Sequence, residues 1–270
     1  MTGGIRAAAA VVSIAFLVAL LAPLVPGDGA TRIDLRSRLE SPAGAPPFGT
    51  DELGRDILAR LLHGASVSLG VAGTAVLVSA LFGSLLGVAA GERGGLLDAG
   101  VGRFVDLVLA FPGLLLAVAL AAVLGPSAKN TVLALCAAGW VPYARLARTE
   151  ARRVSTLDFV AAARAAGAPR SRILVCHLLP NLAAPLVVQA TLHLAGAILA
   201  ESALSFLGLG VPPPAPSWGA MLAAGRAHVF DAPHVVLVPA LAIVTVVVAA
   251  NVLGDALVER LDPARRTRTA

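Results

Sequence analysis

Six long apolar runs constrain the fold of this chain more than any other feature of its sequence. They cover residues 7–25, 67–90, 104–124, 131–146, 184–204 and 235–253. A helix needs about 20 predominantly apolar residues to cross the hydrocarbon core of a bilayer. The runs are rich in Ala, Leu, Val and Gly and lack the two-residue alternation of transmembrane barrel strands. Because only helices and closed barrels span a membrane, the runs predict an all-α membrane protein with six transmembrane helices.

The composition excludes a water-soluble globular domain. Of the 270 residues, 57% are hydrophobic and 14% are charged, and the mean hydropathy is +0.85, whereas soluble domains are about a quarter charged. The net charge of +5 is typical of cytoplasmic loops that face anionic lipid, so we expect the lipid bilayer as a partner and no nucleic acid. Cys136 and Cys176 fit neither a metal-binding spacing nor a disulfide framework.

The distribution of basic residues predicts the topology. With the N-terminus in the cytoplasm, the segments inside carry twice as many Lys and Arg residues as the segments outside. We therefore expect a multi-pass protein of the cell (inner) membrane with both termini cytoplasmic, and we interpret the first run as a retained helix rather than a signal peptide. The expected parts are an N-terminal transmembrane helix in residues 1–27, an extracytoplasmic segment in 28–65, a transmembrane core in 66–257 with a cytoplasmic loop in 147–181, and a basic cytoplasmic tail in 258–270.

The extracytoplasmic segment ends in an amphipathic pattern. Leucine and isoleucine recur at intervals of three and four residues between Leu53 and Leu62, with charged residues on the opposite side. This pattern predicts a helix that anchors the segment at the membrane face, with Thr50 or Asp51 as its N-terminal cap.

The cytoplasmic loop predicts a helix, a sharp turn and a second helix. Ser155 and Asp158 form a capping box before a helix in residues 157–166, and Gly167 takes the left-handed position after it. Ala168 and Pro169 open the second helix, which Pro180 follows. Alanines give the first helix a smooth surface from which Phe159 protrudes, while Arg164, Arg170 and Arg172 are expected in solvent. Each piece is too short to be stable alone, so the hairpin either docks on another protein or rests on its own bundle or on lipid headgroups.

Catalytic and metal chemistry is not indicated. The only lysine, Lys129, follows Ala128, so the chain lacks a phosphate-binding Gly-Lys-Ser/Thr loop. The five histidines lack the i, i+4 pairing and the cysteine neighbours of metal ligands. Ser84 and His193 lie in apolar runs without a recognisable nucleophile turn. We predict no catalytic residue, no metal and no cofactor.

Two features inside the runs remain open at this point. Charged groups are costly in a membrane, and of the few present only Glu201 is clearly away from the cytoplasmic side, unlike Asp106 and Asp255. Glu201 either lines a translocation path or, as we favour, pairs with an arginine of an outer loop. Glycines at positions 83, 87 and 91 form a stripe that lets another helix approach closely, either within this bundle or in a second subunit.

Four ordered blocks resemble the permease subunits of the dipeptide, oligopeptide and nickel ABC importers. The blocks are residues 48–56 with 66–69, residues 158–167 with 177–181, residues 201–210 with 216–219, and residues 251–257 with 261–263. Together they extend over most of the chain from residue 48 onward. The resemblance implies a type I ABC importer permease fold and a non-catalytic subunit. Such a subunit forms half of a translocation path for peptides, a nickel complex or a related small solute such as an opine or glutathione, and works by alternating access.

The resemblance also implies partners and a docking site. The partners are a second homologous permease subunit, two cytoplasmic ATP-binding subunits that hydrolyse ATP, and an extracytoplasmic solute-binding protein. The second block resembles the EAA loop, the coupling helix that docks in a groove of the ATPase. The docking residues it implies are Asp158, Phe159, Ala161, Ala162, Ala163, Arg164 and Gly167. Ala161 stands where the family has its glutamate, so docking here is either weaker or compensated. The rival hypotheses are a self-sufficient secondary transporter and, less favoured, a membrane hydrolase.

Overall fold

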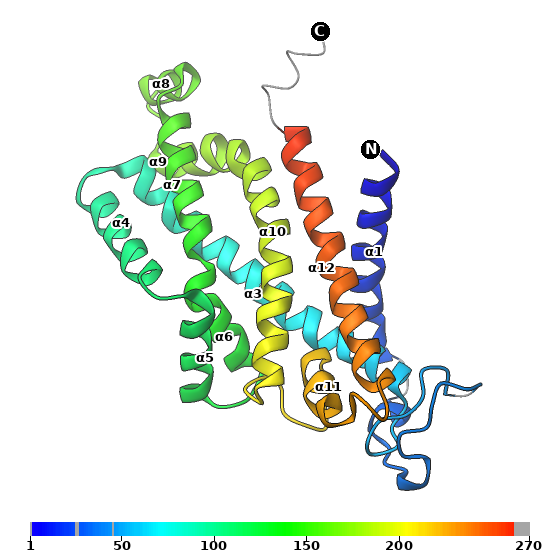
Figure 1. Cartoon of the computed structure of the whole chain (residues 1–270). Helices are drawn as coiled ribbons and strands as arrows, with labels where there is room; N and C mark the ends of the chain where they lie inside the picture. Colours follow the sequence, from blue (N-terminus) through cyan, green and yellow to red (C-terminus); the bar gives the residue numbers. More distant parts are fainter. Residues whose placement is uncertain (1, 25–26, 45, 262–270) are drawn as a thin grey trace.

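A computed structural model describes residues 2–24, 27–44 and 46–261, which are helical for most of their length (Figure 1). The helices are α1 (Thr2–Leu21), α2 (Asp28–Thr31), α3 (Ile57–Arg93), α4 (Gly95–Leu109), α5 (Gly113–Leu124), α6 (Ala128–Gly139), α7 (Val141–Ser155), α8 (Asp158–Ala165), α9 (Arg170–Arg172), α10 (Leu179–Phe206), α11 (Trp218–Gly225) and α12 (His234–Leu261). Short 3-10 turns lie at Ala22–Leu24, Leu35–Ser37 and Arg226–His228, and a π-helical segment, η3, covers Ile173–Leu178. The prediction of an all-α protein is confirmed.

Four continuous helical segments in the described part of the chain are long and apolar enough to cross a membrane. They are Gly3–Leu24, Ile57–Arg93, Arg170–Phe206 and His234–Arg260. The predicted third span is instead a bent pair, because α4 and α5 meet at an angle of 82°. The predicted fourth span falls on α6 and α7, which follow one another across Trp140. The six predicted spans are compatible with this arrangement.

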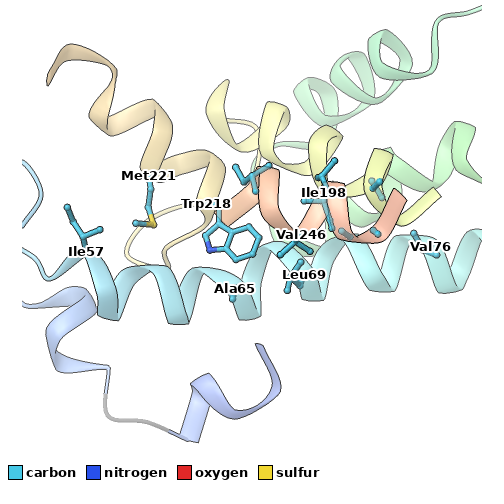
Figure 2. Close-up of a cluster of buried hydrophobic side chains, with 14 of the residues drawn as sticks. Ile57, Ala65, Leu69, Val76, Ile198, Trp218, Met221 and Val246 are labelled. Atoms are coloured by element: carbon cyan, nitrogen blue, oxygen red, sulfur yellow. The ribbon is translucent and has the colours of Figure 1, made fainter. Parts of the chain in front are cut away.

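The long helix α3 runs obliquely through the molecule and contacts both halves of the bundle (Figure 1). Helix α7 packs along its later part and α6 along its middle. Helices α1, α11 and α12 pack nearer its start, and α10 contacts both its earlier and its later part. Figure 2 shows Trp218 of α11 lying over α3, close to Leu69 and Val246. The Trp218 indole N–H donates to the Leu61 carbonyl at 3.0 Å, which fixes α11 to the N-terminal end of α3.

The glycine stripe serves the subunit's own bundle. Cβ atoms added at Gly83, Gly87 and Gly91 would lie 2.2, 2.3 and 2.4 Å from the carbonyl oxygens of Trp140, Ala144 and Arg148. Those carbonyls are spaced four residues apart, as the glycines are, so α3 and α7 touch backbone to backbone over three turns. Close approach of this kind is how small residues hold membrane helices together. The stripe is therefore covered by α7, and the alternative of a second subunit does not apply to it.

The expected interfacial helix is not a separate element. Helix α3 begins at Ile57 and continues without a break into the span. Its N-terminal cap is Asp56, whose carboxylate accepts from the backbone N–H groups of Leu58 at 2.8 Å and Ala59 at 3.4 Å. The prediction of Thr50 or Asp51 as the cap is therefore wrong, because the chain forms a turn there before the helix starts.

Asp51 instead organises the turn that precedes α3. Its carboxylate accepts from the backbone N–H groups of Leu53 at 2.9 Å and Arg55 at 3.0 Å. The guanidinium groups of Arg55 and Arg60 lie 2.7 and 3.2 Å from the same carboxylate. The amphipathic pattern thus reflects a folded turn and the first turns of a long helix rather than a surface anchor.

Candidate functional site

The hairpin that contains α8 lies at one end of the molecule, the end at which α1 begins and α12 finishes (Figure 1). Its first helix covers Asp158–Ala165, close to the predicted range. The predicted capping box is wrong, because α7 continues to Ser155 and Leu157 becomes the N-cap, without a side-chain cap. The Ser155 hydroxyl is buried and has no hydrogen-bond partner among the described residues.

The turn after α8 has the predicted conformation. Gly167 has a φ of +79°, which is the left-handed region. The Ala168 N–H donates to the Ala163 carbonyl and the Gly167 N–H donates to the Arg164 carbonyl, both at 3.0 Å. Nothing lies within 4 Å of a Cβ added at Gly167. The requirement for glycine here is therefore conformational rather than steric.

The second arm of the hairpin does not end at Pro180. Helix α9, segment η3 and α10 form one helical run from Arg170 to Phe206, so this arm continues into a span. The Leu179 N–H donates to the Leu174 carbonyl, five residues back, which is the wider π-helical pattern. This wider turn lies directly before Pro180, which has no N–H to donate. The second arm of the hairpin is thus joined to α10 by continuous helix.

One side of α8 is anchored and the other is free. Val160 is fully buried in a cluster with Val154, Ile173 and Leu178. Phe159 is 43% exposed. The other predicted docking residues are exposed except Ala163, which is half-buried; they are Asp158, Ala161, Ala162, Arg164 and Gly167. The helix therefore presents a surface of small side chains, and the partly exposed Phe159 ring lies beside it against the His177 ring, with the ring centroids 6.1 Å apart.

Two of the arginines expected in solvent, Arg164 and Arg170, lie close to a buried carboxylate that the sequence analysis does not single out. The guanidinium groups of Arg164 and Arg170 lie 3.6 and 4.0 Å from Glu92 Oε1. The Glu92 side chain is 4% exposed and lies near the end of α3. These residues flank the Gly167 turn on both sides, so Glu92 links the hairpin to α3. Contacts between residues this far apart in sequence leave no local pattern.

A second charged cluster lies on the same side of the molecule. Arg148 of α7 donates to both carboxylate oxygens of Asp98 in α4, with the Nη2 to Oδ2 distance at 2.9 Å. Arg152 donates to the same carboxylate. This cluster holds α4 against α7, the helix from which the hairpin emerges.

Glu201 neither pairs with an arginine nor faces solvent. It is 0% exposed, and its carboxylate accepts from the Ser205 hydroxyl at 2.7 Å. The Ser202 hydroxyl lies 3.5 Å from the other carboxylate oxygen, and the Ser68 hydroxyl of α3, which is near the carboxylate, accepts from the backbone N–H of Trp218 at 3.1 Å. Among the described residues no ion pair with Glu201 forms, so the favoured pairing is wrong; Arg55 and Arg60 are held by Asp51 instead. Glu201 is therefore held within the protein by hydroxyl groups of its own helix, α10, beside the contact between α3 and α11.

The long apolar helices and the exposed hairpin at one end of their bundle (Figure 1) are the architecture of a multi-helix integral membrane protein. The sequence matches the family described as "Binding-protein-dependent transport system inner membrane component" over residues 83–267. The chain belongs to this family.

Curated relatives cover most of the chain. It is 41% identical over 247 residues to the dipeptide transport system permease protein DppC of Alkalihalophilus pseudofirmus, which is 92% of this chain and 81% of the relative. It is 48% identical over 219 residues to the di/tripeptide transport system permease protein DppC of Pseudomonas aeruginosa, which is 80% of this chain and 71% of the relative. It is 40% identical over 240 residues to the glutathione transport system permease protein GsiD of Pectobacterium atrosepticum, which is 89% of this chain and 80% of the relative.

Proposed function

We propose that this chain is the non-catalytic permease subunit of an ATP-driven importer and forms half of the translocation path for peptides or a related small solute. The observation that carries the proposal is the α8 surface, which is exposed on one side and anchored through Val160 on the other. The names of the relatives favour peptides and glutathione as cargo over a nickel complex. The partners are a second permease subunit, two ATP-binding subunits and a solute-binding protein.

The proposed mechanism is alternating access driven from the hairpin. Closure of the ATP-binding subunits displaces α8, which is seated on them. The displacement reaches α10 through the continuous helical run from Arg170 to Phe206. It reaches α3 through Glu92, and α3 is locked to α7 by the glycine stripe. These three helices then rock as one body relative to the second subunit and expose the path to the other side.

Reconstitution tests this proposal against its rivals. The chain is co-expressed with the second permease and the ATP-binding subunits, purified through a tag on this chain and placed in proteoliposomes. We expect co-purification of the ATP-binding subunits and uptake of a dipeptide that requires both ATP and the binding protein. Uptake by this chain alone, driven by a proton gradient, would instead establish a secondary transporter.

The orientation that we propose places α8 and both termini in the cytoplasm. Phe230, which is fully exposed near the opposite end, should then be extracytoplasmic, whereas the exposed Ser171 should be cytoplasmic. In a background with Cys136→Ala and Cys176→Ser, Phe230→Cys should react with a membrane-impermeant thiol reagent in spheroplasts and Ser171→Cys should react only after permeabilisation. Thr50 and Ser217 are poor labelling sites because both are buried. The reverse labelling pattern would invert the topology.

Ala161 tests whether the small-residue surface of α8 is the docking face. We expect Ala161→Glu to lower co-purification of the ATP-binding subunits by about fivefold, because a carboxylate buried without a partner costs about 1 kcal/mol or more. Thr156→Glu, which adds the same charge at an exposed position before α8, is the matched control and should change little. Unchanged co-purification with Ala161→Glu would move the contact to the side of α8 that carries Phe159 and Ala166.

A further inference from the structure

A groove between α5, α6, α7 and α10 has one hydrogen-bonding side chain. Its walls are otherwise glycine, alanine, leucine and proline, including Gly113 of α5, Gly139 of α6, and Gly196 and Ala200 of α10. His193 is the exception. These small side chains leave an open space in the groove. Two of its four helices, α7 and α10, are also among those that move with the hairpin in the proposed mechanism.

The His193 ring is held in a defined position. The Tyr143 hydroxyl lies 3.1 Å from His193 Nδ1, and the two ring centroids are 5.5 Å apart. Tyr143 is fully buried. A Cβ added at Gly139 would lie 3.0 Å from His193 Cε1, so Gly139 makes room for the imidazole. The Tyr143 hydroxyl is the hydrogen-bond partner of His193 Nδ1. His193 Nε2 makes no hydrogen bond within the described part of the chain.

A second polar side chain, Ser79, lies beside the groove. The residue is 1% exposed, and its hydroxyl is near the Cys136 thiol. The hydroxyl oxygen would lie 2.7 Å from a Cβ added at Gly139, the glycine that adjoins His193. Unpaired polar groups inside a membrane protein are costly unless they face water, a ligand or a partner. His193 lies near the middle of α10 (Leu179–Phe206), so its Nε2 is too far from the membrane surface to hydrogen-bond to a lipid headgroup.

We propose that the groove is this subunit's wall of the translocation path and that His193 Nε2 is its hydrogen-bonding contact with a peptide-like solute. This inference rests on the proposed function. Peptide-like solutes share amide and carboxylate groups and differ in their side chains. One hydrogen-bonding residue among small apolar residues can bind the shared group without selecting among the side chains. Tyr143 acts as a positioning residue, because it reaches the solute only through the imidazole.

Transport by the reconstituted importer is the first test. His193→Ala should reduce dipeptide uptake by about tenfold, the effect of losing one hydrogen bond of about 1.4 kcal/mol. His193→Gln, which keeps a donor and an acceptor, should retain most of the uptake. Tyr143→Phe should raise the KM with a smaller change in kcat. Leu199→Ala is the control, since Leu199 is 51% exposed on α10 and does not line the groove.

Cysteine accessibility is the second test and separates the possible occupants. In the background with Cys136→Ala and Cys176→Ser, His193→Cys should react with a charged thiol reagent in the assembled complex, and saturating dipeptide should slow the reaction. Leu199→Cys should show no protection by dipeptide. A cross-link from His193→Cys to the second permease without protection by dipeptide would make the groove a subunit interface and overturn the inference.

The outcomes distinguish this inference from the function on which it rests. If the unmodified complex imports dipeptide and His193→Ala imports it equally well, the inference is wrong and the proposed function stands. If the unmodified complex shows no ATP-dependent uptake, the proposed function fails, and the assignment of the groove to a path fails with it.

Discussion

We expect Gly87→Val to prevent the protein from folding. A Cβ at Gly87 would lie 2.3 Å from the Ala144 carbonyl oxygen and 2.9 Å from the Ala147 Cβ. Neither is the end of a flexible side chain, so α3 and α7 must separate, and the destabilisation should exceed the about 1–3 kcal/mol that is typical of overpacking. Membrane extracts should give a monodisperse size-exclusion peak for the native chain and only aggregate for Gly87→Val.

A matched pair of alanine variants isolates the packing effect. Gly87→Ala meets the same backbone atoms, whereas Gly70→Ala, on the same helix, meets nothing within 4 Å. Alanine is favoured over glycine inside a helix by about 0.5–1 kcal/mol. Gly70→Ala should therefore leave the thermal midpoint in detergent unchanged or slightly raised, while Gly87→Ala should lower it. Equal midpoints for the two variants would show that α3 and α7 are not in backbone contact.

The helical membrane fold could be predicted because its signal is local. Apolar runs long enough to span must form helices in lipid, whatever they pack against. The break in the third run was missed because hydropathy continues across it. Pro112 caps α5 directly after α4 ends, and the chain turns there by 82°. A proline within an apolar run is tolerated in many membrane helices, so the sequence alone did not distinguish a kink from a sharp turn.

The hairpin shows where local signals stop. Gly167 could be predicted because a left-handed residue after a short helix favours glycine in any context. The continuation past Pro180 could not, because a π-helical segment forms only where neighbouring helices hold it, here through the buried Ile173 and Leu178. The N-cap was misplaced because α7 extends to Ser155 over a buried face that includes Ala151 and Val154.

The charged contacts that link the hairpin to α3 are long-range. Glu92 precedes Arg164 by more than seventy positions in the sequence. Helix α7, whose apolar surface packs the hairpin against the bundle, lies between these two residues in the sequence. Glu201 was expected to seek an arginine because charges in membranes are usually paired. The hydroxyl groups of Ser205 and Ser202, on the same helix, satisfy it instead. The polar groups that need partners can be identified from the sequence. Which partner each group finds depends on how the helices pack.

The second large effect is expected at Gly167. Its φ of +79° costs an L-residue about 1–2 kcal/mol, and a β-branched side chain more. Gly167→Val should shift the turn toward other conformations and re-aim α8 relative to the continuous helix that starts at Arg170. We expect uptake and transport-coupled ATP hydrolysis to fall about tenfold, with the amount of inserted protein unchanged, because nothing packs against this position. Initial uptake rates in proteoliposomes measure the effect.

Gly167→Asn separates conformation from the mere addition of a side chain. Asparagine adopts the left-handed region far more readily than valine does, and the space around Gly167 accommodates either side chain. If the turn transmits force from the ATP-binding subunits, Gly167→Asn should retain most of the uptake that Gly167→Val loses. Equal loss in both variants would mean that the partner covers this position and excludes any Cβ. Full activity in both would show that the turn between α8 and α9 has no part in coupling, and would leave Val160 and Glu92 as the connections through which α8 acts.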